Sequence, residues 1–235
     1  MRKSGYLTIA FDDAYLDTYK HAIHYLNKLN IKSTIAVAAG LIGKKLEKRP
    51  IIGFRECRML LRSGHEIASH TLTHPNLLRI DKAGEDRAKF EIIDSKRVLE
   101  KKLSCKISSF VFPYIAQNES PALRKTAGAV YKSMRLTSDR PVFNRIPVKN
   151  PRKITGFAIM RKHSAAYLKK HIDYVEKENR WLIEVFHLVS DKNTKSAHRP
   201  KPYRFFMHID DFKKHVDYIL SKNIMILTQR DALKL

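Results

Sequence analysis

The sequence is poor in the residues that build linkers, disulfide frameworks and membrane spans. Its 235 residues include 8 glycines, 9 prolines and 2 cysteines. This scarcity excludes a collagen-like or low-complexity chain and a long flexible linker. Cys57 and Cys105 cannot form a disulfide framework by themselves, which agrees with a reducing compartment. The longest apolar run, residues 34–43, has about half of the ~20 residues that a membrane-spanning helix needs.

The amino end has only the beginning of a secretory signal. Arg2 and Lys3 are basic, but the apolar run after them stops at Asp12 and Asp13 and is too short for a signal peptide. No small-residue cleavage site follows. We therefore expect a cytoplasmic protein.

Acidic residues are outnumbered two to one. There are 46 Lys and Arg against 23 Asp and Glu, which gives a net charge of +23 and a pI near 10.0. Such a charge attracts polyanions, including nucleic acid, anionic membrane surfaces and phosphorylated glycans. Basic clusters at 44–49 and 198–204 leave a glycan- or nucleic-acid-binding module open as an alternative. No recognised nucleic-acid module is present, so we expect no specific nucleic-acid binding.

Short apolar runs alternate with segments of helical periodicity. The pattern predicts strands at 6–11, 33–38, 66–69, 107–112, 129–135, 145–148, 181–187 and 224–227, and helices at 16–29, 54–62, 82–103, 121–127, 164–178 and 210–221. Strands separated by helices pair in parallel, with the helices covering the sheet. Seven or so such units favour an α/β barrel in one domain, residues 1–235, with its chemistry at the carboxyl ends of the strands.

Candidate metal ligands follow two of these strands. Asp12 and Asp13 come directly after strand 6–11, and adjacent carboxylates ionise together only where a cation or water offsets their repulsion. His70 and His74 follow strand 66–69, and histidines four residues apart can reach one ion from a single turn. Two imidazoles and a carboxylate suit zinc or another borderline divalent ion. Each pattern alone is also typical of a solvated turn or of structural histidines.

Two further positions follow apolar strands in the same way. His187 ends the run 181–187, and the ordinary pKa of histidine suits a general acid, although a structural role is the alternative. Pro113 and Tyr114 follow strand 107–112, where backbone N–H groups are free to face a ligand. We expect all four groups to meet at one face of the barrel.

Together these segments resemble the motifs of the polysaccharide deacetylases, the NodB-homology superfamily, along essentially the whole chain. The matching segments are Phe11-Asp12-Asp13, residues 64–75 (GHEIASHTLTHP), Phe112-Pro113-Tyr114 and Val185-Phe186-His187, of which the second is the most specific. The resemblance implies a distorted (β/α) barrel and a metal-dependent N- or O-deacetylase.

The resemblance also implies residue roles and ligands. Asp13, His70 and His74 would hold a divalent metal, Asp12 would be the general base and His187 the general acid. The backbone N–H of Tyr114, next to Pro113, would help to form the oxyanion hole. The expected ion is zinc, with cobalt, nickel and manganese as alternatives. The expected substrate is an N-acetylated sugar in a polysaccharide, an oligosaccharide or a lipid-linked glycan.

The sequence departs from the family pattern at three places. Many members carry an arginine two residues before the third-motif proline, where this chain has Val111, and a glycine where it has Ile115. The fourth motif is not found, and in segment 131–146 Arg145 is the candidate for the missing cation beside Asp12 and for a substrate contact. These departures leave open the hydrolysis of another non-peptide C–N bond, such as a formamide, and a binding protein with an inert metal site.

Overall fold

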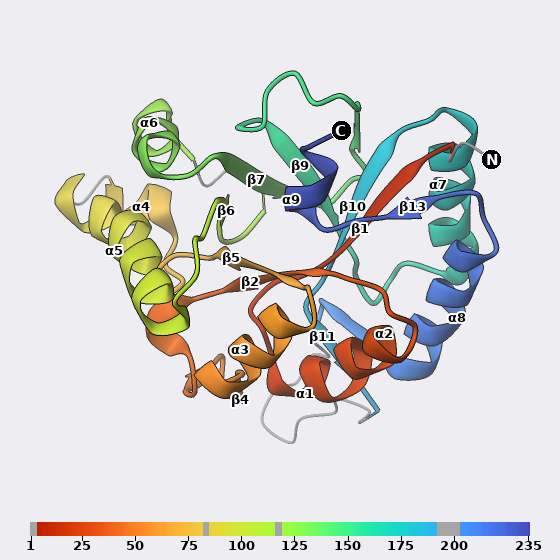
Figure 1. Cartoon of the computed structure of the whole chain (residues 1–235), viewed down its shortest axis with the longest axis horizontal. Coiled ribbons are helices and arrows are strands. Elements are labelled where there is room, and N and C mark those ends of the chain that lie inside the picture. Colours follow the sequence, from red (N-terminus) through yellow and green to blue (C-terminus); the bar gives the residue numbers. More distant parts are fainter. Residues whose placement is uncertain (1–3, 82–84, 116–118, 192–202) are drawn as a thin grey trace.

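The computed structural model describes residues 4–81, 85–115, 119–191 and 203–235. Parallel strands form a closed barrel in the order β1, β2, β5, β6, β7, β9, β10, and β10 pairs with β1 to complete the circle (Figure 1). The barrel strands are β1 (Tyr6–Phe11), β2 (Thr34–Val37), β5 (Glu66–Ser69), β6 (Ser109–Val111), β7 (Ser133–Ser138), β9 (Ile154–Ala158) and β10 (Trp181–Phe186). The predicted (β/α) barrel of about seven parallel strands is therefore confirmed.

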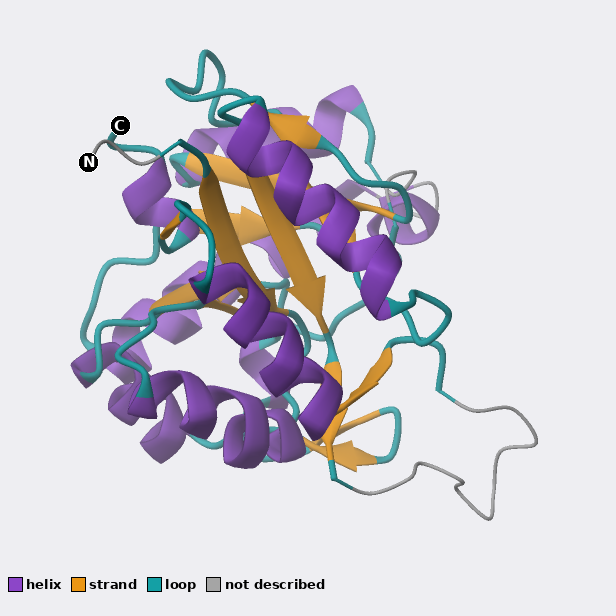
Figure 2. Ribbon diagram, turned by 90° about the vertical axis from the view of Figure 1, so that its right-hand side faces the viewer, coloured by secondary structure: helices purple, strands orange, loops and turns teal. Residues whose placement is uncertain are grey.

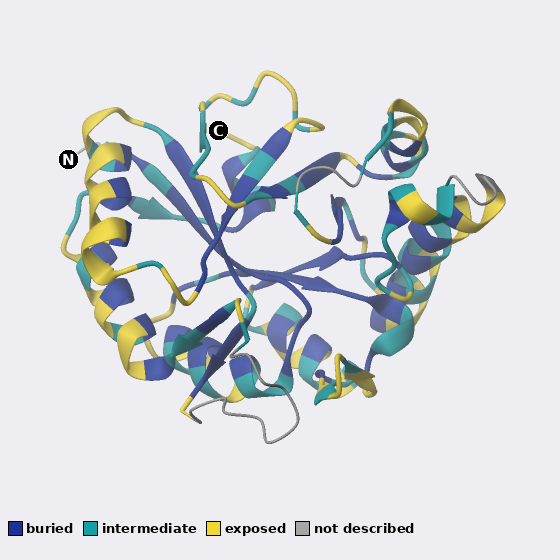
Figure 3. Ribbon diagram, turned by 180° about the vertical axis from the view of Figure 1, so that it is seen from behind, coloured by how far each residue is buried: buried dark blue, intermediate teal, exposed yellow. Residues whose placement is uncertain are grey.

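Helices surround the barrel and bury its outer face (Figure 2). They are α1 (Leu16–Thr18), a π-helical turn (Tyr19–Ile23), α2 (His24–Lys28), a 3₁₀ turn (Ala39–Leu41), α3 (Phe54–Arg62), α4 (Leu77–Asp81), α5 (Glu85–Leu103), α6 (Pro121–Val130), α7 (Ala165–Lys177), α8 (Ile209–Leu220) and α9 (Gln229–Ala232). The strands are buried along nearly their whole length, whereas the outward helix faces are exposed (Figure 3). Parallel strands covered in this way read as continuous apolar runs in the sequence.

Local signals place the helix ends. Ser120 and Ser164 precede α6 and α7, and their hydroxyls accept hydrogen bonds from the N–H groups of Leu123 and Tyr167. These side chains satisfy backbone donors that the first helical turn leaves free. Gly64, which follows α3, has φ +85°, a conformation that glycine adopts without steric cost.

Short strands lie outside the barrel circle. They are the hairpin β3 (Lys45–Leu46) and β4 (Arg49–Pro50), the parallel pair β11 (Leu188–Ser190) and β12 (Phe206–His208), β8 (Phe143–Asn144), which runs antiparallel to β10, and β13 (Met225–Ile226), which runs parallel to β1. Both cysteines carry free thiols. No helix in the described part of the chain combines the length and the apolarity that crossing a bilayer requires.

One predicted strand is wrong and another begins too early. Residues 129 and 130 of the predicted strand 129–135 continue α6, so that β7 begins only at Ser133. Residues 145–148 form no strand, because Pro147 has no N–H to donate to a sheet and both Arg145 and Pro147 are exposed. The barrel position is filled instead by β9, which the apolar pattern did not predict.

Candidate metal centre

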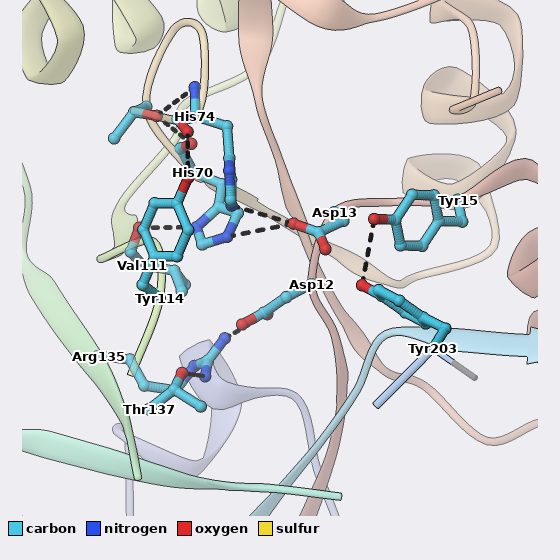
Figure 4. Close-up of polar contacts among 11 residues, drawn as sticks. Asp12, Asp13, Tyr15, His70, His74, Val111, Tyr114, Arg135, Thr137 and Tyr203 are labelled. Carbon is cyan, nitrogen blue, oxygen red and sulfur yellow. Dashed lines mark hydrogen bonds and ion pairs between the residues drawn. The ribbon is translucent and has the colours of Figure 1, made fainter. Parts of the chain in front are cut away.

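Asp13, His70 and His74 meet at the carboxyl end of the barrel (Figure 4). One ligand atom from each lies within 4.8 Å of the other two. The Nε2 atoms of His74 and His70 are 3.1 and 3.7 Å from Oδ1 of Asp13. Donor atoms about 2.1 Å from a shared ion are separated by roughly this much.

The protonation states of His70 and Asp13 favour a cation. His70 donates its Nδ1 proton to the carbonyl oxygen of Val111, so the lone pair is on Nε2, which faces Asp13. Burial lowers the pKa of His70 to about 4, which keeps the ring neutral at pH 7. Burial alone would raise the pKa of Asp13, but the imidazoles of His74, His187 and His70 outweigh it and hold that pKa below its ordinary value.

Oδ1 of Asp13 is buried, and its polar neighbours are the Nε2 atoms of His74 and His70. A buried carboxylate oxygen is stable only with a partner, and here it faces two imidazole nitrogens. One carboxylate and two imidazoles form a donor set that suits zinc and similar divalent ions and leaves positions for water. The residues present therefore fit a resident divalent metal ion.

The loop that carries both histidines is held by α5. The carboxylate of Glu91 accepts hydrogen bonds from the N–H groups of Leu72 and Thr73 and from the Thr73 hydroxyl, at 2.6–2.9 Å. The loop is not a regular helical turn, since His74 has φ +61°. Asp13 and Tyr114 have φ +68° and +65°, so three groups around the cavity occupy the left-handed region. Such conformations persist at functional sites where surrounding contacts enforce them.

Asp12 pairs with Arg135 rather than with Arg145. Arg135 Nη2 donates to Oδ1 of Asp12 at 2.5 Å, and its Nη1 donates to Thr137 at 2.9 Å. The prediction that Arg145 stands beside Asp12 is wrong. Arg145 is exposed and follows β8, whose last residue pairs with Trp181 at the amino end of β10, opposite the metal centre.

A cavity of about 580 Å³ opens above the cluster. Asp12, His187 and Tyr114 line it, whereas Pro113 is buried beside it. The ring of Tyr114 packs on His74, with 5.0 Å between ring centroids. The His187 backbone is fixed by the hydroxyl of Thr18, which donates to its carbonyl at 2.7 Å.

Nδ1 of His187 is buried without a hydrogen-bond partner among the described residues. One face of the ring stacks on Phe205, with the centroids 4.6 Å apart and the planes at 30°. The sequence therefore brings His187 to the cavity, but the position of its ring is set by an aromatic contact rather than by a carboxylate.

Several residues of the site escaped the sequence analysis. Arg135 lies inside the buried strand β7, and a cation within a predicted strand is the signal that could have identified it. Tyr203, Arg204 and Phe205 form one wall of the cavity. Tyr203 and Arg204 end the basic cluster 198–204, whose residues 198–202 lie outside the described part of the chain, and Phe205 follows it. The neighbouring Phe206 is buried in a hydrophobic cluster.

Comparison with known proteins gives one family. Residues 2–131 match the family model of polysaccharide deacetylase. A protein of Bacillus subtilis (strain 168), YxkH, assigned as a polysaccharide deacetylase, is 27% identical over 111 residues. The match covers 47% of this chain and 37% of YxkH, so the chain matches little more than a third of that protein's length.

Solved structures share the fold at low identity. The peptidoglycan N-acetylglucosamine deacetylase Bc1960 is 16% identical, with a TM-score of 0.61 over 97% of this chain and 88% of Bc1960. BA3943 of Bacillus anthracis, a CE4-family pseudoenzyme, is 14% identical, with a TM-score of 0.61 over 99% of this chain and 66% of BA3943. Identities this low show the fold alone. Because the fold is shared by a deacetylase and a pseudoenzyme, activity must be argued from the site.

Proposed function

Because the chain belongs to the polysaccharide deacetylase family, we propose that it is a metal-dependent hydrolase that removes acetyl groups from N-acetylated sugars. Asp13, His70 and His74 would hold the ion, with zinc as the expected metal and cobalt, nickel or manganese as alternatives. We take residues 1–235 as one catalytic domain. The cytoplasmic location, and contact of the basic surface with anionic membranes, stay predictions.

The arrangement of Asp12 and His187 suits amide hydrolysis. A bound divalent ion supplies Lewis acidity, which lowers the pKa of a nearby water and polarises the acetyl carbonyl. Asp12, oriented by Arg135, accepts the proton that this water loses as its oxygen bonds to the carbonyl carbon. The Tyr114 N–H donates to the oxyanion. His187 donates a proton to the departing nitrogen, the C–N bond breaks, and acetate and a free amine result.

One observation carries this proposal: the buried Oδ1 of Asp13 faces the Nε2 atoms of two histidines, at distances that suit a shared ion. Its neighbour Asp12 is oriented by a separate partner, Arg135, and lines the same cavity. The two carboxylates are thus in different environments, one suited to a cation and one suited to a proton. This division of roles favours hydrolysis over an inert binding site.

Two substitutions separate the proposed roles. Asp12→Asn should retain bound metal but lower acetate release from N-acetylglucosamine oligomers by at least about 100-fold, because the proton acceptor is lost. His74→Ala should lose both the metal and the activity. Metal content by elemental analysis and acetate release by an enzymatic assay give the two readouts. Full activity in both variants would falsify the assignment.

The alternatives predict different results in the same assay. A hydrolase of another C–N bond would release formate, or open a small cyclic amide, without releasing acetate from sugars. A binding protein with an inert site would hold metal and turn over none of these substrates.

A further inference from the structure

A cationic side chain stands at the edge of the catalytic cavity. Arg204 lines this cavity, and its guanidinium lies 5.3 Å from the centroid of the Phe205 ring. Its Nε donates to the sulfur of Met160 at 3.2 Å. No carboxylate in the described ranges forms an ion pair with Arg204. Because Phe205 stacks on His187, only one aromatic ring separates this cation from the proposed general acid.

Arg204 connects the catalytic cavity with a second one. Met160 lines the second cavity, of about 530 Å³, and the N–H of the next residue, Arg161, donates to the carbonyl oxygen of Arg204 at 2.9 Å. Arg161 in turn lies over the ring of Phe206, 4.7 Å from its centroid. Each cavity is thus lined by an arginine that packs on an aromatic ring: Arg204 on Phe205 in the catalytic cavity, and Arg161 on Phe206 in the second cavity.

The second cavity is strongly basic. Three permanent cations line it, Arg161, Lys169 and Lys214, against one carboxylate, Asp211. Three histidines, His163, His208 and His215, add to its polar lining. Elsewhere on the surface, lysines commonly pair with carboxylates, as Lys96 does with Glu100 at 3.1 Å. No such pair is formed by Lys169 or Lys214 in the described part of the chain, and Lys169 instead lies 4.6 Å from the ring of Tyr218.

Two helices begin at this cavity and add to its positive potential. Ser164 and His208, the residues that precede α7 and α8, both line it, and these helices have 13 and 12 residues. Their amino ends carry partial positive charge, which falls off within the first turn. An anion in this cavity would therefore meet side-chain cations and helix ends together, whereas a neutral sugar would gain nothing from them.

We propose that Arg204 and the second cavity form a subsite for the negatively charged part of the substrate, a phosphate or carboxylate carried by a sugar next to the acetylated one. This proposal rests on the proposed function and narrows its substrate class to acidic glycans. The planar guanidinium of Arg204 suits bidentate contact with either group. Arg161, Lys169 and Lys214 would bind the anionic groups of sugars farther along the same glycan.

The test compares matched substrates with the metal-loaded full chain. The substrates are a neutral N-acetylglucosamine oligomer, an oligomer in which N-acetylglucosamine alternates with a uronic acid, and one with a phosphate on the neighbouring sugar. The readout is the ratio of kcat/KM for each anionic substrate to that for the neutral one. We expect a ratio above about 10 in the unmodified chain, equivalent to about 1.4 kcal/mol. Whichever of the two anionic substrates, the carboxylate or the phosphate, gives the larger ratio carries the anion that the subsite prefers.

Variants locate the subsite. Arg204→Ala should lower the ratio at least about tenfold, mainly through KM, and Arg204→Lys should restore part of it. The double variant Lys169→Ala, Lys214→Ala should also lower this kcat/KM ratio, with the larger effect for longer anionic chains. The control is Arg62→Ala, an exposed arginine at the end of α3 that lines neither cavity and whose loss changes the net charge equally. Arg62→Ala should leave the ratio unchanged.

The outcomes for the subsite and for the proposed function are distinct. An equal kcat/KM for neutral and anionic substrates, or a ratio that Arg204→Ala does not change, overturns the subsite but leaves the deacetylase intact. If no substrate releases acetate, the proposed function fails, and calorimetric binding of the deacetylated anionic oligomers then decides the subsite. Tenfold weaker binding in Arg204→Ala supports it, and equal or absent binding overturns it.

Discussion

Arg135 is fully buried, and a buried guanidinium is stable only where partners satisfy it. Thr137 and Asp12 accept hydrogen bonds from its two Nη atoms, and the contact with Asp12 both neutralises the charge of Arg135 and orients the proposed base. The cation is supplied by β7, whereas the family pattern has it two residues before Pro113, on the neighbouring strand. The cation that the resemblance predicts beside Asp12 is thus supplied from another element.

Arg135 should act as a positioning residue. Arg135→Leu should lower kcat about 100-fold or more with KM little changed, because Asp12 loses its orientation while the cavity wall remains. Metal content should stay at the level of the unmodified chain, and Arg135→Lys should recover part of kcat. Folding must be verified, since removing one partner of a buried pair costs about 3–5 kcal/mol. Unchanged kinetics in a folded Arg135→Leu variant would contradict the role.

His65 is a second buried polar residue, with a structural role. Its Nδ1 accepts a hydrogen bond from the N–H of Ser33 at 3.0 Å, and its Nε2 donates to Asn27 at 2.8 Å. The neutral ring satisfies both contacts, whereas a proton on Nδ1 would break the first. Burial, with the charge of Lys32, lowers the pKa of His65 to about 4.

This pKa predicts a loss of stability in acid. Between pH 6.5 and about 4 the unfolded chain binds a proton at His65 that the folded chain does not, so the free energy of unfolding falls as the pH falls through this range. The loss should reach at most about 3 kcal/mol. The free energy of unfolding in urea is measured at several pH values for the unmodified chain and for His65→Gln. The difference between the two proteins isolates the effect of His65, because every other group titrates in both. A pH-independent difference between the two proteins would exclude it.

At the scale of elements, the placement of β9 depends on Gly156. A Cβ at this position would lie 2.6 Å from Cγ2 of Val185 on β10 and 3.0 Å from Nη1 of Arg135 on β7. Glycine therefore lets β9 fit between β7 and β10 while the side chain of Arg135 extends to Asp12. In a sequence, a glycine within a short apolar run weakens the strand signal, which explains why β9 was missed.

Gly156→Ala should disturb both packing and the site. We expect the free energy of unfolding to fall by about 1–3 kcal/mol, since neither Val185 nor Arg135 can move freely in the barrel. Acetate release should fall as well, because Arg135 is displaced from Asp12. Chemical unfolding and kinetics on the metal-loaded protein measure the two effects.

The matched control is Gly128→Ala on α6. There a Cβ would meet the side chain of Arg152 at 3.4 Å, an ordinary contact, so alanine should be neutral or stabilise the helix by about 0.5–1 kcal/mol. A Gly156→Ala variant as stable and as active as Gly128→Ala would refute the packing argument.

At the scale of the whole molecule, the last residues close the amino end of the barrel. The N–H groups of Gln229 and Arg230 donate to Thr34 Oγ1 and Glu66 Oε2, both at 2.8 Å. Gln229 is fully buried, and its side chain reaches Ser133 on β7. These contacts join β2, β5 and β7 beneath the barrel, at the end opposite the metal centre.

Removal of residues 228–235 should therefore destabilise the whole barrel. It removes the Arg230 N–H from the buried carboxylate of Glu66, which keeps only the hydroxyls of Thr34 and Ser109 as donors, and it exposes the strand ends. We therefore expect a loss of at least about 3 kcal/mol, measured by urea unfolding. Removal of Lys234 and Leu235 alone, both exposed, should change stability by less than about 1 kcal/mol. Equal stability of the two truncated chains would show that α9 contributes nothing.

Most elements were predictable because their signals are local. Continuous apolar runs identified β1, β2, β5 and β10, and helical periodicity identified α3, α7 and α8 nearly to the residue. The false strand at 145–148 and the missed β9 lie in one stretch where proline, glycine and short runs weaken the pattern.

The sequence by itself determined the barrel and the segments that carry Asp13, His70 and His74, since alternation of elements and position after a strand are properties of the chain order. Only the tertiary structure decided that Arg135, and not Arg145, neutralises Asp12, and that Arg204 links two cavities. Such contacts join residues over a hundred positions apart, such as Asp12 and Arg135. Their pairing depends on which side chains the closed sheet brings together, and no local sequence pattern shows which residues so far apart in the chain will meet.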